Sequence, residues 1–103
     1  MAQVLTSQSA AVSTRRSAFE IRMDILRVAA EGSAKPTHIM YRSNTSWIVM
    51  QKNLEFLVGS GFMQVSTGCS RVEYAITERG REVLRDYISL VDRAAAYPPE
   101  VRA

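Results

Sequence analysis

Two short helical segments joined by a very short break constrain this chain more than any other feature of its sequence. The first segment, KPTHIMYRS, covers residues 35–43 and has proline in or near its first turn, where proline is well tolerated. Asn44 follows, and asparagine accepts the left-handed backbone that a tight break requires. Thr45 or Ser46 then caps a helix over residues 47–58. Because so short a connection makes two helices cross steeply, the pattern predicts a helix-turn-helix.

A further helix precedes this pair. Ser17 and Glu20 have the spacing of a capping box, in which a hydroxyl and a carboxylate satisfy each other's backbone donors. Gly32 can take the left-handed conformation that ends a helix. The apolar residues between them form two neighbouring stripes, Phe19, Met23, Leu26 and Ala30 on one and Ile21, Ile25 and Val28 on the other. This arc is wider than one partner requires, so we expect the helix to pack on two sides.

The period of the sequence changes after the third helix. Residues 62–66 and 71–76 carry β-branched and aromatic residues, with turn chemistry at 67–70, which predicts a β-hairpin. Thr77 then caps a long final helix that Pro98-Pro99 ends. One side of that helix is apolar, with Val83, Leu84, Tyr87, Ile88, Leu90, Val91, Ala94 and Ala95, and the other is charged.

Together these segments predict an α+β fold that is mainly α. It is a winged helix-turn-helix of three helices and a β-hairpin wing, followed by a long C-terminal helix. The 103 residues suffice for one small domain. We divide the chain into a flexible N-terminal arm (1–16), a winged-helix DNA-binding domain (17–77), a C-terminal dimerisation helix (78–97) and a tail (98–103).

Composition argues against most enzyme and membrane classes. No apolar run approaches the ~20 residues that span a bilayer, and residues 1–16 lack the pattern of a secretion signal. The chain has one cysteine, Cys69, and one histidine, His38. Neither paired carboxylates, a nucleophile–histidine arrangement nor a phosphate-binding glycine loop is found. We therefore expect a cytoplasmic, nucleoid-associated protein that is not an enzyme, with no metal, cofactor or small-molecule ligand, in which Cys69 is incidental rather than redox-active.

The chain also resembles a known family. The segments DILRVAAEG, KPTHIMYRSNTSW, NLEFLVGSGF and YAITERGREVLRDY resemble small archaeal winged-helix DNA-binding proteins with a C-terminal coiled-coil helix. THIMYRSN and ITERGREVL are the distinctive stretches. The resemblance covers residues 17–90 and implies sequence-tolerant or regulatory binding to duplex DNA by dimers whose last helices pair as an antiparallel coiled coil.

In a helix-turn-helix the second helix enters the major groove with its N-terminal side chains at the base edges. The candidates here are Thr45, Ser46, Ile48, Val49, Gln51 and Lys52. Glutamine can bond adenine and lysine can reach guanine or a phosphate, whereas isoleucine and valine only touch thymine methyls, so we expect modest sequence preference. Phosphate candidates are Lys35, Thr37, His38, Arg42 and Arg71, and Arg15 and Arg16 suit a basic arm in a minor groove. The net charge of +3 is compatible with a polyanion partner.

Each candidate also has a structural interpretation. Lys52, Arg42 and Arg71 can be ordinary solvated charges, and Thr37 and Ser46 are helix caps first. His38 fits a surface or packing role better than that of a switch or ligand. Trp47 fits core or edge packing better than base stacking. The glycosylation pattern Asn44-Thr45-Ser46 is better explained as a turn plus a cap.

The final helix predicts a homodimer, with Leu84, Tyr87, Ile88 and Val91 facing a partner chain. The alternative is a monomer whose last helix folds entirely onto its own core. The leading function is duplex-DNA binding by a transcriptional regulator or chromatin-like factor. The alternative is a winged-helix protein–protein interaction module, since Ile48, Val49 and Phe56 on an exposed face also suit a protein groove. The DNA target, the direction of regulation and any effector stay open.

Overall fold

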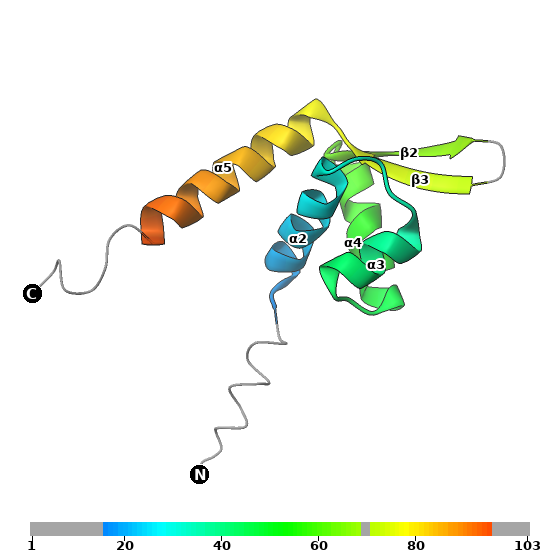
Figure 1. The fold of residues 1–103 in the computed structure, drawn as a ribbon, viewed down its shortest axis with the longest axis horizontal. Coiled ribbons are helices and arrows are strands. Elements are labelled where there is room, and N and C mark those ends of the chain that lie inside the picture. Colours follow the sequence, from blue (N-terminus) through cyan, green and yellow to red (C-terminus); the bar gives the residue numbers. More distant parts are fainter. Residues whose placement is uncertain (1–15, 69–70, 96–103) are drawn as a thin grey trace, which may run out of the picture.

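The computed structural model describes residues 16–68 and 71–95. In this part of the chain four helices and one antiparallel hairpin follow each other (Figure 1). They are α2 (Ala18–Ala30), α3 (Pro36–Ser43), α4 (Trp47–Gly59), β2 (Met63–Gly68), β3 (Arg71–Ile76) and α5 (Glu78–Ala95). The predicted α+β, mainly α, winged-helix architecture with a C-terminal helix is confirmed. None of the helices in the described ranges combines the length and apolar character needed to cross a bilayer.

The turn between α3 and α4 has the predicted chemistry. Asn44 takes the left-handed conformation, with φ 56° and ψ 52°. Ser46, rather than Thr45, caps α4, because its hydroxyl accepts the Val49 N–H at 3.3 Å. The interpretation of Thr37 as a cap is wrong. Pro36 is already helical, so the cap position falls on Lys35, whose side chain makes no capping hydrogen bond.

Helix α2 begins with the predicted capping box. Ser17 Oγ accepts the Glu20 N–H at 3.1 Å, and Glu20 Oε1 accepts the Ser17 N–H at 2.9 Å. The helix ends at Ala30, and Gly32 reverses the chain with a φ of 141° that side-chain-bearing residues rarely adopt.

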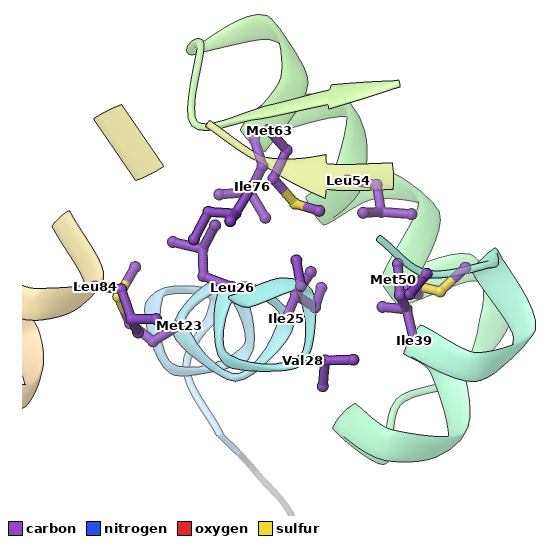
Figure 2. Close-up of a cluster of buried hydrophobic side chains, with 13 residues drawn as sticks. Met23, Ile25, Leu26, Val28, Ile39, Met50, Leu54, Met63, Ile76 and Leu84 are labelled. Atoms are coloured by element: carbon purple, nitrogen blue, oxygen red, sulfur yellow. The ribbon is translucent and has the colours of Figure 1, made fainter. Parts of the chain in front are cut away.

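The core surrounds α2 on two sides, as the width of its apolar arc predicts. Ile25 and Val28 pack towards Ile39 and Met50 of the helix pair, whereas Met23 meets Leu84 of α5 (Figure 2). Leu54 and Leu57 of α4, Met63 of β2 and Ile76 of β3 complete the buried cluster. Helix α2 is therefore the shared support of the helix-turn-helix and of α5 (Figure 1).

The hairpin is longer on its first strand than predicted. Strand β2 starts at Met63 instead of Phe62 and continues to Gly68, which pairs with Arg71. Residues 69 and 70, which include Cys69, lie outside the described residues. A feature that periodicity does not reveal is the bridge between Ala34 and Tyr74, with N–H to O distances of 2.9 and 2.8 Å. This bridge attaches the loop before α3 to the wing.

Helix α5 is fixed at its start. Thr77 caps it as predicted, its hydroxyl accepting the Gly80 N–H at 3.1 Å and donating to the Gly61 carbonyl at 2.6 Å. The backbone N–H of Thr77 also donates to the Phe62 carbonyl at 3.1 Å. From this junction α5 runs alongside α2 and then extends beyond it (Figure 1).

Candidate nucleic-acid interface

Most of the outer face of α4 is not covered by other parts of the described chain. Ile48 is 67% exposed, Val49 37% and Phe56 44%, and Lys52 is also exposed. Gln51 is half-buried. Met50, Leu54 and Leu57 on the opposite side are buried and hold the helix on the core. The predicted base-reading residues of α4 therefore lie where a ligand can reach them.

A side-chain network that the sequence did not reveal fixes one flank of α4 to α2. Arg22 Nε donates to Asn53 Oδ1 at 2.9 Å, and Asn53 Nδ2 donates to the Val49 carbonyl at 2.8 Å. The Arg22 guanidinium also stacks on the Phe56 ring, 3.6 Å from its centroid. Asn53 is only 6% exposed. A polar residue on the buried side of α4 was the one available signal, but it does not say which residue is its partner.

Two grooves lie side by side at the start of α3, and Lys35 and Thr37 line both. The first, of about 410 Å³, runs between α3, the start of α4 and the wing, and its other lining residues are Pro36, Trp47, Arg71 and Val72. The second, of about 510 Å³, is lined in addition by Ser33, Ala34, His38, Tyr41 and Glu73. The predicted phosphate residues Lys35, Thr37 and Arg71 are thus brought together, and His38 is exposed nearby.

Two predicted cationic contacts have partners within the chain. Arg42 forms an ion pair with Glu31 at 3.2 Å, on the side of α3 where α2 ends. Arg16 belongs to the fold rather than to a free arm: it pairs with Asp24 and donates to the carbonyls of Ser43, at 2.8 Å, and Asn44. The Arg16 guanidinium is thus engaged across the helix-turn-helix turn, and its predicted contact with a minor groove stays a prediction. Arg15 lies outside the described residues.

Thr45 is half-buried within the turn itself. Its Oγ1 lies 3.2 Å from Ser43 Oγ, which in turn donates to the Ile39 carbonyl. Thr45 therefore stabilises the turn in this structure, and the exposed hydroxyl next to α4 is that of Ser46.

The predicted dimerisation residues of α5 differ in burial. Leu84 is 7% exposed and belongs to the chain's own core, next to Met23 (Figure 2). Tyr87 and Ile88 are half-buried, and Tyr87 meets Phe19 of α2 edge-to-face at 5.4 Å. Leu90 and Val91 are 64% and 40% exposed. An apolar surface free for a partner therefore starts near Tyr87 and continues towards the end of α5.

Within residues 16–68 and 71–95, no cluster of three or more histidine, cysteine, aspartate or glutamate side chains has the arrangement of a metal site. The uncovered surface consists of an exposed helix face with one lysine, flanked by a groove whose two cations come from different elements.

Comparison with known proteins identifies the family of this chain and several related proteins. The family described as "Winged helix-turn-helix" matches residues 15–94. Sso10a-2, a DNA-binding protein from Sulfolobus solfataricus, is 30% identical, with a TM-score of 0.66 over 84% of this chain and 94% of that one. An uncharacterized protein of Methanocaldococcus jannaschii is 30% identical over 78 residues, 76% of each chain.

A more distant likeness concerns the fold alone. Lactococcus lactis ZitR, solved in complex with DNA, is 18% identical with a TM-score of 0.64, over 80% of this chain and 58% of that one. The two relatives at 30% identity are both archaeal, in agreement with the resemblance described from the sequence.

Proposed function

Because this chain belongs to the winged helix-turn-helix family, we propose that it binds duplex DNA with α4 in the major groove, as a transcriptional regulator or chromatin-like factor. The observation that carries the proposal is the uncovered outer face of α4, with Ile48, Val49 and Lys52 exposed on a helix whose other side is buried. The similarity to Sso10a-2 over most of both chains supports it.

The residues of α4 suit weak discrimination between DNA base sequences. Lys52 supplies a donor for guanine or phosphate, and Ile48 and Val49 can only touch thymine methyl groups. Gln51 can bond adenine, but its side chain is half-buried. We therefore propose modest sequence preference, with most of the affinity coming from the backbone of the duplex.

Backbone contacts fall to Lys35, Arg71 and Lys52, with Thr37, His38 and the Ser46 end of α4 as polar contributors. Arg42 and Arg16 are left out because their guanidinium groups are occupied by partners in the chain. Three phosphate contacts correspond to a slope of log K against log[salt] of about −2.7 per protomer.

The test is a titration of duplex DNA at several salt concentrations, comparing the wild type with Lys52→Ala and with Arg85→Ala. Both variants remove one cation, but Arg85 lies on α5, away from the interface. We expect Lys52→Ala to weaken binding to all sequences and to reduce the slope by about 0.9, because a phosphate contact carries little base information. Arg85→Ala should match the wild type. A wild-type slope near zero contradicts DNA binding.

We further propose that the protein is a homodimer that pairs through α5, and that it is associated with the nucleoid in the cytoplasm. Leu90 and Val91 are exposed, and Tyr87 and Ile88 are only half covered by α2. Apolar surface of this kind on a charged helix is stabilised by burial against a second apolar face. A second copy offers that face with the matching pattern.

A protein-binding role is the second candidate, and one observation favours it: Ile48 and Tyr41, exposed by 67% and 76%, are apolar or aromatic residues on the helix pair. Such residues suit a protein groove better than a phosphate chain. The same titration separates the two candidates, since a protein-interaction module has no salt-dependent affinity for random duplex DNA.

A further inference from the structure

The groove between α3, the start of α4 and the wing combines two chemistries in one place. Its apolar residues are Trp47, Pro36 and Val72, and the Trp47 side chain is 44% exposed although it begins the buried face of α4. Lys35, on the loop before α3, and Arg71, on β3, contribute the two cations. No acidic residue lines this groove.

The neighbouring groove is a natural comparison, because Lys35 and Thr37 line it too. There the wing contributes Glu73 instead of Arg71, and Glu73 Oε1 accepts the Ser33 hydroxyl at 3.0 Å. A carboxylate in the second groove repels an anion, whereas the first groove is lined by two cations, Thr37 and apolar side chains. This difference in charge indicates that the first groove, called the Trp47 groove below, is the better site for an anionic chain with apolar parts.

We propose that this groove holds the sugar–phosphate backbone of one DNA strand, with Trp47 and Val72 against a deoxyribose and Lys35 and Arg71 on the flanking phosphates. The inference rests on the proposed function and adds to it a defined binding site for the DNA backbone. Deoxyribose presents apolar carbon atoms between charged phosphates, which matches a groove lined by apolar side chains and two cations. Trp47 is then a DNA contact that reads no base.

The experiment uses Trp47 itself, the only tryptophan of the chain, as a reporter. The full-length protein is titrated with a random-sequence duplex at low salt. Indole fluorescence and the anisotropy of an end-labelled duplex are followed together. We expect the indole emission to change with the same midpoint as the anisotropy, and to the same extent for A·T-rich and G·C-rich duplexes.

The groove has a matched pair of variants. Val72 and Val65 lie on the same face of the wing, two register pairs apart, and are 40% and 44% exposed. Val65 lines a different hollow, beside Leu54 and Val58 of α4. Val72→Glu should weaken duplex binding by about tenfold or more because its carboxylate faces phosphate, while Val65→Glu stays near the wild type. Should Val72→Glu fail to fold, the Lys35→Ala/Arg71→Ala double variant should flatten the salt slope by about 1.8.

The outcomes separate this inference from the proposed function. Two results overturn the backbone-binding role of this groove and leave DNA binding intact. One is an anisotropy change that reports binding while the indole emission stays constant. The other is an equal loss of duplex affinity in the two valine variants. Tighter binding of a single strand with a larger indole change overturns that role too, because the groove then stacks bases. No anisotropy change at any salt concentration overturns both.

Discussion

Gly80 shows how one missing side chain fixes the start of α5. A Cβ atom at this position would overlap the Phe62 carbonyl oxygen and lie 2.8 Å from Ile76 Cγ1. That carbonyl already accepts the Thr77 N–H, so it cannot move away without a loss. Glycine is therefore needed in the ITERGREVL stretch for close packing of α5 on the turn before β2, and its backbone conformation is ordinary.

Gly80→Ala should lower the free energy of unfolding by about 1–3 kcal/mol, the range for overpacking a tight site. In an open helix the same change would instead stabilise by up to ~1 kcal/mol. Gly59→Ala, in α4, is the control because a Cβ there meets nothing within 4 Å. Urea denaturation of both variants measures the difference. Equal stability of the two would show that the site around Gly80 can relax.

At this scale, residues with local partners could be predicted and residues with distant ones could not. Ser17 and Glu20, Asn44, Ser46 and Thr77 depend on backbone within a few positions, so sequence spacing identified them. Arg16 was assigned to a free arm, yet its carbonyl partners lie 27 and 28 residues away. Such partners are selected by the fold, and spacing along the chain carries no information about them.

The position of α4 depends on both of its flanks. On one side Arg22 connects to Asn53 and Phe56, and on the other the wing packs against Leu54 and Val58. The helix itself was predictable from its caps and its apolar spacing. Its attachment to α2 was not, because neither an arginine nor an asparagine in an amphipathic pattern indicates which helix it will meet.

Arg22→Ala should lower the free energy of unfolding by about 1–2 kcal/mol, since it removes one hydrogen bond and a cation–π contact at a half-exposed site. It also leaves the buried Asn53 Oδ1 without this donor. Arg27→Ala, an exposed arginine on the same helix, should cost less than half as much. Thermal or urea denaturation measures both. If the two variants lose equally, the network does not hold α4 in place.

For the molecule as a whole, the direction of α5 is the property with the largest consequences. Sequence periodicity predicted a long helix with one apolar side, which the structure shows from Glu78 to Ala95, but not how that side divides between the chain and a partner. The predicted end of the helix before Pro98 lies outside the described residues. Leu84, expected to face another chain, is used internally against Met23. The division depends on the angle at Thr77, which only the assembled turn at Gly61 and Phe62 determines.

Val91→Asp should convert the proposed dimer to a monomer, because a carboxylate would be buried in an apolar contact. Light scattering at micromolar concentration should then give 11.5 kDa, against twice that mass, about 23 kDa, for the wild type. Ser89→Asp introduces the same charge at an exposed position on the polar side of α5 and should remain dimeric. A wild-type mass of 11.5 kDa contradicts the dimer.

The bridge between Ala34 and Tyr74 joins the wing to the loop that leads into α3. This backbone link between the two walls of the Trp47 groove opposes a change in the width of the groove. When this groove holds the DNA backbone as proposed, a misfit between groove and duplex is taken up by bending or twisting of the DNA, whose deformability varies from one base step to the next. The affinity of such a protein for different genomic sites would then follow the deformability of the DNA, even where no base edge is contacted.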